Sequence, residues 1–204
     1  MASAVAAAVK KPPVPAALGD NFNGKARKAA KLSLAAAPTE NFNDLSKLIA
    51  SLPPVSAMVK LNIPTTADSI RVQQEKRNIH VAGFLFAASA EADNDFHLIV
   101  GRDPKAGQEM YMTMEVSGLP PATASYPAFK SLKTARTAYK KFFGKNLPGA
   151  GYHFYQPPIP VQIDGSLFFD ATHSTGQAPG PPSLKSRMPT IWEVHPISSI
   201  KLGP

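Results

Sequence analysis

The strongest hydrophobic pattern in the chain lies between Asn78 and Val100, and it predicts two strands joined by an acidic turn. Apolar side chains fill both faces of the first strand, Ile79–Ala88, with Gly83 inside the run. Apolar and other residues alternate along the second strand, Phe96–Val100. A glycine within so apolar a strand predicts a bend or a close approach of two backbones.

Three further segments alternate with a period of two residues and predict strands, namely Met110–Val116, Val161–Phe169 and Thr190–Leu202. Pro127–Phe143 instead has a helical period, with proline in its first turn and Gly144 after its end. We therefore expect a mainly β fold, a five-stranded OB-like Greek-key barrel with one helix between strands 3 and 4. An open α+β sheet with the same elements is the alternative.

Residues 1–54 differ from the rest of the chain because they are rich in Ala, Lys and Pro and contain few large apolar residues. This composition predicts a largely disordered, flexible N-terminal arm, with helical turns at Lys25–Ala36 and Asn43–Ser51. Residues 55–204 are then the barrel domain. Within it, Met58–Ile63 predicts a short edge strand, and Gly149–Pro160 predicts an aromatic and proline-rich loop.

The formal net charge of +8 is concentrated in two places, the arm and the predicted helix. Residues 125–145 carry six Lys or Arg and no Asp or Glu. The candidate phosphate contacts are Lys130, Lys133, Arg136, Lys140 and Lys141. The leading functional hypothesis is a binding module for nucleic acid or another polyanion, with steep salt dependence. The alternative for this helix is a solvated basic face over the barrel.

Three features that the sequence lacks bear on the kinds of site and segment to expect. The chain has no cysteine, which excludes disulfides and thiolate metal sites. No apolar run approaches the roughly 18–20 residues of a membrane-spanning helix. The first residues are apolar and then basic, which is the reverse of a secretory signal, so we expect neither a signal peptide nor a membrane span.

Acidic and imidazole side chains recur where an OB-like barrel would bring two loops, residues 91–95 and 170–189, to one rim. Eight such residues are expected to converge there: Asp93, Asp95, His97, Glu115, Asp170, His173, Glu193 and His195. Asp95 and His97 are two apart on an extended segment, as are Glu193 and His195, so each pair is aimed at one face.

Carboxylate oxygens and imidazole nitrogens are ligands for divalent metals and also serve as general acids and bases. The candidate metal ligands are Asp95, His97, Asp170, His173 and His195, and the candidate catalytic groups are Asp95, His97, Glu115 and Glu193. They support a rival hypothesis, a metal-dependent, phosphodiesterase-like hydrolase. The other alternative is a structural or interaction protein, in which turn chemistry and backbone hydrogen bonds explain these polar residues. No spacing matches a strong metal motif.

The same residues carry a family resemblance that covers about residues 78–202. The matching segments are Gly83, DNDFHL at Asp93–Leu98, Glu115, FFD at Phe168–Asp170, His173, GQAP at Gly176–Pro179 and WEVHP at Trp192–Pro196. The chain resembles an uncharacterised family of small bacterial OB-like β-barrel proteins with a DxDxHL, FFDxxH and ExHP pattern. The resemblance implies the fold but no established activity. The insert at Gly180–Pro189 departs from the family pattern.

Overall fold

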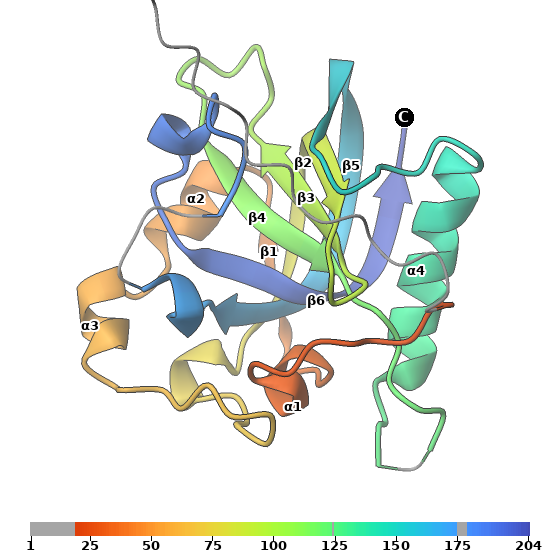
Figure 1. Cartoon of the computed structure of the whole chain (residues 1–204). Coiled ribbons are helices and arrows are strands. Elements are labelled where there is room, and N and C mark those ends of the chain that lie inside the picture. Colours follow the sequence, from red (N-terminus) through yellow and green to blue (C-terminus); the bar gives the residue numbers. More distant parts are fainter. Residues whose placement is uncertain (1–18, 124, 175–178) are drawn as a thin grey trace, which may run out of the picture.

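A computed structural model describes residues 19–123, 125–174 and 179–204, and it is mainly β, as predicted (Figure 1). The strands are β1 Thr39–Phe42, β2 Asn78–Ala90, β3 Phe96–Gly101, β4 Tyr111–Val116, β5 His153–Phe169 and β6 Trp192–Leu202. The α-helices are α1 Lys28–Lys31, α2 Leu45–Ala50, α3 Val55–Val59 and α4 Phe129–Phe143. Short 3₁₀ turns are η1 Gln73–Glu75, η2 Ala171–His173 and η3 Lys185–Arg187.

The six strands form one mixed sheet in the order β1-β2-β3-β4-β6-β5, and β5 also pairs with β2. Neighbouring strands are antiparallel except for β1 with β2 and β4 with β6, which are parallel. β2 therefore pairs with three strands, β1, β3 and β5. The expected count of five strands is wrong, because β1 adds a sixth.

The glycine inside β2 has the close backbone approach that its position predicted. A Cβ at Gly83 would lie 2.9 Å from the carbonyl oxygen of Gly101 and 3.0 Å from a methyl of Val100 on β3. The β2–β3 register shifts between Leu85 and Ala87, two residues further along. Any larger residue at position 83 would push β2 and β3 apart.

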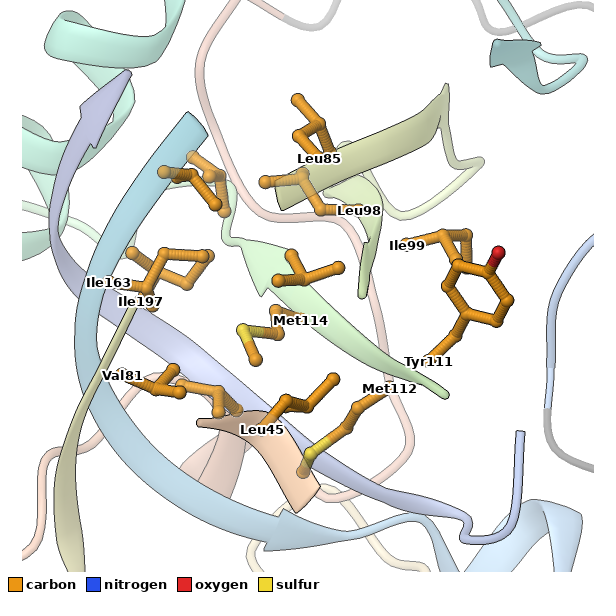
Figure 2. Close-up of a cluster of buried hydrophobic side chains, with 14 of the residues drawn as sticks. Leu45, Val81, Leu85, Leu98, Ile99, Tyr111, Met112, Met114, Ile163 and Ile197 are labelled. Atoms are coloured by element: carbon orange, nitrogen blue, oxygen red, sulfur yellow. The ribbon is translucent and has the colours of Figure 1, made fainter. Parts of the chain in front are cut away.

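The main core lies between the strands and collects their inward-facing apolar side chains (Figure 2). Leu85, Leu98, Met114 and Ile163 are completely buried there. A second, smaller cluster joins Phe22 and Leu32 of the N-terminal region to Leu119, Ala128 and Leu132, the last of them on α4. Helix α4 packs along β6 and β4, and it ends at Gly144, which has a left-handed φ of 53°.

The N-terminal region departs most from expectation. Residues 19–54, predicted to be a largely disordered arm, instead carry α1, β1 and α2, and Leu45 and Leu48 of α2 are completely buried in the main core. Residues 1–18 of the predicted arm lie outside the described residues. The segment Met58–Ile63 also differs from the expected edge strand, since its first two residues end α3 and the edge strand is β1.

The predicted loop Gly149–Pro160 is mostly strand, because β5 begins at His153. Its prolines concealed the strand, since proline lacks the N–H that a sheet needs. The strand accommodates them at an irregularity. Phe154 pairs with Ala87 and Ile159 pairs with Leu85, so Pro157 and Pro158 fall where the register shifts. Within the described residues, no helix has both the length and the hydropathy to cross a membrane.

Candidate metal centre

Three neighbouring strands present their polar side chains on one face of the sheet. His97 on β3 is the register partner of Glu115 on β4, and Thr113 on β4 is the partner of Glu193 on β6. Since alternate residues of a strand share a face, Glu115 and His195 also meet side by side. The opposite faces of these strands carry core residues. The spacing of two residues in the sequence thus becomes a ladder of imidazoles and carboxylates across three strands.

This polar face borders a cavity of about 530 Å³. The predicted convergence is confirmed, because six of the eight residues line the cavity: Asp93, His97, Glu115, Asp170, His173 and Glu193. The other two, Asp95 and His195, are buried. His195 contacts Glu115 of the lining, and Asp95 contacts His195. We call Asp95, His97, Glu115, Glu193 and His195 the cavity cluster. The resemblance residues Gly176–Ala178 lie outside the described part of the chain.

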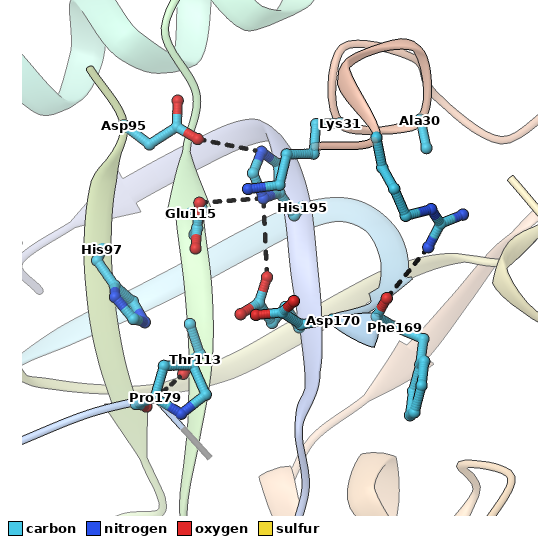
Figure 3. Close-up of polar contacts among 12 residues, drawn as sticks. Ala30, Lys31, Asp95, His97, Thr113, Glu115, Phe169, Asp170, Pro179 and His195 are labelled. Atoms are coloured by element: carbon cyan, nitrogen blue, oxygen red, sulfur yellow. Dashed lines mark hydrogen bonds and ion pairs between the residues drawn. The ribbon is translucent and has the colours of Figure 1, made fainter. Parts of the chain in front are cut away.

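His195 lies at the centre of the cavity cluster and has no exposed surface (Figure 3). Its Nε2 is 3.4 Å from Oδ2 of Asp95, and its Nδ1 is 3.0 Å from Oε2 of Glu115 and 3.8 Å from Oε2 of Glu193. Neither ring nitrogen makes a hydrogen bond of good geometry to any described residue, and neither does Oδ2 of Asp95. Such atoms are costly to bury unless a further partner binds them.

His97 is oriented from one side of its ring. Nδ1 is 3.1 Å from the Tyr152 hydroxyl and 3.7 Å from Oε1 of Glu91, whose own position is held by Ser89. The nearby carboxylate favours the tautomer with the proton on Nδ1, which leaves a lone pair on Nε2. Nε2 is buried, and it has no hydrogen-bond partner among the described residues.

The three buried carboxyl groups of the cavity cluster have pKa values shifted in opposite directions. Burial raises the pKa of Asp95 and of Glu193 well above the usual range, and Glu115 raises both further. Burial acts in the same direction on Glu115, but His195 and Lys31 lower the pKa of Glu115 well below its usual range. Burial lowers the pKa of His195. Glu115 is therefore the ionised member, while Asp95 and Glu193 favour protons unless another cation replaces them.

Lys31, at the end of α1, points into this group of carboxylates (Figure 3). Its Nζ is 3.7 Å from Oδ2 of Asp93 and 5.8 Å from the centre of the Phe168 ring. Burial would lower the pKa of Lys31, but the carboxylates of Glu115, Asp95, Glu193 and Asp93 outweigh it and raise that pKa overall. The ammonium is therefore firmly charged. The sequence had placed this lysine in a solvated arm.

Residues 20–31, here called the covering segment, reach the cavity because their two ends are fastened. Asp20 receives hydrogen bonds from Arg136 and Lys140 on α4, both at 2.8 Å. At the other end, Arg27 donates to both oxygens of Glu75, at 2.6 and 2.7 Å, and its guanidinium lies 4.7 Å from the Phe168 ring centre. Lys25, Ala26 and Lys31 then form one wall of the cavity.

A second buried arginine ties this wall to the sheet. Arg71 donates hydrogen bonds to the carbonyl oxygens of Ala30, Leu167 and His195. Arg27, Arg71 and Glu75 are all buried, and together we call them the brace. No sequence motif distinguishes Glu75 or Arg71 from neighbouring surface charges, so the sequence did not reveal the brace.

Asp170 and His173 form a pair on another wall of the cavity. Nδ1 of His173 contacts Oδ2 of Asp170, which is also the N-cap of η2. The hydrogen bond to Asp170 raises the pKa of His173. Burial acts to raise the pKa of Asp170, but hydrogen bonds from His173 and Thr172 lower it overall.

Two sets of three side chains within the described residues have ligand atoms close enough to share one cation. One set is His97, Glu115 and Glu193, the other is Asp95, Glu115 and His195, and the atoms of each set lie within 4.8 Å of one another. The predicted ligands Asp170 and His173 line the cavity but belong to neither set. Glu115 and Glu193, predicted only as catalytic groups, belong to the sets instead.

The five basic residues predicted for nucleic acid do not form one free surface. Arg136 is buried, and both Arg136 and Lys140 form ion pairs with Asp20. Lys130, Lys133 and Lys141 are exposed. The structure therefore removes two of the five predicted phosphate contacts.

Comparison with known proteins gives no relative for this chain: no family model, curated protein or solved structure matches it. The kinship expected from the DxDxHL, FFDxxH and ExHP segments stays a prediction, and the function has to be argued from the site alone.

Proposed function

We propose that this protein is a metal-dependent hydrolase, phosphodiesterase-like, that holds a divalent cation between His97, Glu115 and Glu193. The observation that carries the proposal is His97, whose Nδ1 is engaged by Tyr152 while its buried Nε2 has no hydrogen-bond partner among the described residues. Imidazole ligands of metals typically have this arrangement, in which one nitrogen binds the ion and the other is held by a neighbour. Two carboxylates on adjacent strands complete the set.

The arrangement suits catalysis because its three protein ligands border an open cavity. Catalytic metal sites keep a coordination position for water or substrate, and a bound divalent ion would lower the pKa of that water and polarise the substrate. Lys25 and Lys31, on the covering segment, supply positive charge for an anionic substrate such as a phosphoester. His173, held by Asp170, is placed to carry a proton across the cavity.

Metal uptake by purified protein tests this proposal directly. After dialysis against Mn²⁺ or Zn²⁺ and removal of free ions, elemental analysis should find bound metal, and a chelator should lower the melting temperature. His97→Gln should lose the metal and the hydrolysis of a simple phosphodiester. His80→Gln is the matched control, because His80 pairs with Asp164 on another part of the sheet. Wild-type protein that takes up no metal would refute the proposal.

The OB-like barrel is part of the same proposal. Its support is the pattern of pairings, since β2, β3, β4, β6 and β5 pair in that order and β5 pairs again with β2. Helix α4 lies in sequence between β4 and β5, the connection where an OB-fold has its helix. β1 is then an addition to the five-stranded arrangement, paired along β2.

Binding of nucleic acid or another polyanion is the second candidate function, and one observation favours it. Lys130, Lys133 and Lys141 are exposed on α4 and form no ion pair with any described residue. Three uncompensated lysines on one helix attract phosphates, and such binding weakens steeply with salt. A barrel of this type could combine a phosphodiester-binding surface with the metal centre.

Removing these lysines tests the second candidate. The triple variant Lys130→Gln, Lys133→Gln and Lys141→Gln should release single-stranded DNA at lower salt than wild type and reduce the salt slope by about 2. The control triple removes the same charge elsewhere, at Lys60, Lys105 and Lys201, which are also exposed. Equal losses in both triples would show non-specific attraction, and no retention by wild type at low salt would exclude the candidate.

A further inference from the structure

The two candidate cation sets share Glu115, which raises the question of how many ions the cavity cluster takes. The second set, Asp95, Glu115 and His195, contains the most deeply buried unpartnered atoms of the cavity, Oδ2 of Asp95 and both ring nitrogens of His195. Those atoms would suit a second ion. Lys31, however, extends from α1 towards the same atoms (Figure 3).

We propose that the Lys31 ammonium is the resident cation of the Asp95–Glu115–His195 set, so that the wild-type chain holds one divalent ion and loss of this ammonium creates a two-ion site. This inference rests on the proposed function, because it presupposes that the His97–Glu115–Glu193 set binds a metal. It adds the number of ions and names the residue that determines it.

Charge balance is the first argument. Asp95, Glu115 and Glu193 are buried carboxyl groups, and they carry three negative charges when all are ionised. Lys31 offsets one of these charges, and one divalent ion offsets the other two. Buried charges are stable only when they are compensated. Among these three carboxylates and Lys31, one divalent ion gives a net charge of zero, and a second would leave an excess positive charge.

The second argument is the way in which Lys31 is held. A charged ammonium donates hydrogen bonds but cannot coordinate a metal, so it excludes a nearby ion by repulsion. Lys31 cannot easily withdraw, because the Arg27–Glu75 hydrogen bonds and the contact of Arg71 with the Ala30 carbonyl fix α1 over the cavity. Asp93 holds the ammonium from the other side, at 3.7 Å.

Counting bound Mn²⁺ tests the inference. At saturating Mn²⁺, elemental analysis should find one ion per chain in wild type and two in Lys31→Met, which keeps an unbranched side chain, one atom shorter, and removes its charge. Lys25→Met is the matched control, because Lys25 lines the same cavity and should leave the count at one. Adding Asp95→Asn to Lys31→Met should return the count to one, since it removes a ligand of the second set.

Each result has a separate meaning. Two ions in wild type, or one ion in folded Lys31→Met, would overturn the role of Lys31 and leave the proposed function standing. No ion in wild type would refute the proposed function itself. If Lys31→Met does not fold, the electron paramagnetic resonance spectrum of Mn²⁺-loaded wild type decides. Magnetically isolated Mn²⁺ supports the inference, and a pair of coupled ions, which lie about 3.5–4 Å apart in two-metal sites, contradicts it.

Discussion

The brace and the cavity cluster are both buried groups of charged side chains, yet the atoms that they leave without hydrogen bonds differ in kind. Among the described residues, those of the brace are two N–H donors, Nε of Arg27 and Nε of Arg71. In the brace, Oε1 of Glu75 accepts from Arg27 and from the Phe169 amide, and Oε2 accepts from Arg27 and from the Val72 amide. In the cavity cluster, four atoms have no hydrogen-bond partner among the described residues: Oδ2 of Asp95, Nε2 of His97 and both ring nitrogens of His195.

This difference shows how buried charges that hold the fold together can be distinguished from those of a binding site. A buried carboxylate with its hydrogen bonds complete, such as that of Glu75, needs no other partner and holds the chain in place, and the unpartnered N–H donors of the two arginines cannot bind a cation. A buried group with unpartnered atoms beside a cavity is destabilising unless a ligand binds there. Burial alone would not separate the two groups, because Glu75, Glu193 and His195 are all buried to the same degree.

The largest effect is expected from breaking the brace. Glu75→Gln leaves the Arg27 guanidinium buried without its charge partner, so the free energy of unfolding should fall by about 3–5 kcal/mol. Denaturant unfolding measures this loss. The control is Glu40→Gln, which removes a carboxylate from an ion pair with Arg77 that is largely exposed and should cost less than about 1 kcal/mol. Equal losses in the two variants would contradict the role of the brace.

A smaller effect is expected at the residue that orients His97. Tyr152→Phe removes the hydroxyl beside Nδ1, so Mn²⁺ affinity measured by calorimetry should fall about 10- to 100-fold, as for other residues that orient a metal ligand. Tyr155→Phe serves as the control, because Tyr155 packs against Phe143 outside the cavity. Unchanged affinity in the Tyr152 variant would show that the Tyr152 hydroxyl does not orient His97 for metal binding.

The smallest expected effect is a gain in stability rather than a loss, and it concerns Glu193. Burial raises the pKa of Glu193 in the folded protein, so in metal-free protein its contribution to stability is present below pH about 4.5 and is lost as pH rises through the raised value. Glu193→Gln avoids this loss and should stabilise metal-free protein at pH 8 by on the order of 1 kcal/mol. Thermal unfolding at pH 4 and pH 8 measures it. If the variant is less stable than wild type at pH 8, Glu193 stabilises the fold, as Glu75 does in the brace.

The strands were predictable because their side chains alternate. The ends of β3 and β4 fall within one residue of the segments Phe96–Val100 and Met110–Val116. The convergence of Asp95, His97 and His195 followed from spacing two residues apart on strands that meet. By contrast, β1 is only four residues long and the covering segment is held by scattered long-range contacts, such as Arg27 to Glu75, which leave no periodic pattern in the sequence.

The grouping of the ligands was not predictable either. Asp170 and His173 looked equivalent to the other acidic and imidazole residues, but the η2 turn directs them towards each other. Which carboxylates could share an ion depends on cross-strand register, as for Glu115 beside His97. A sequence gives the residue types of a site more readily than their pairing, because register is fixed by turns and bulges far from the site.

The fastening of Asp20 to α4 has a practical consequence for how this protein should be shortened. A fragment beginning at Asn78 would retain β2 to β6 but would lack Lys25, Lys31 and the contact of Asp20 with Arg136. Such a fragment would expose the polar face of β3, β4 and β6 as an open groove, in which water solvates the carboxylates. The minimal working unit therefore starts upstream of Asp20, well before the first strand of the apparent domain.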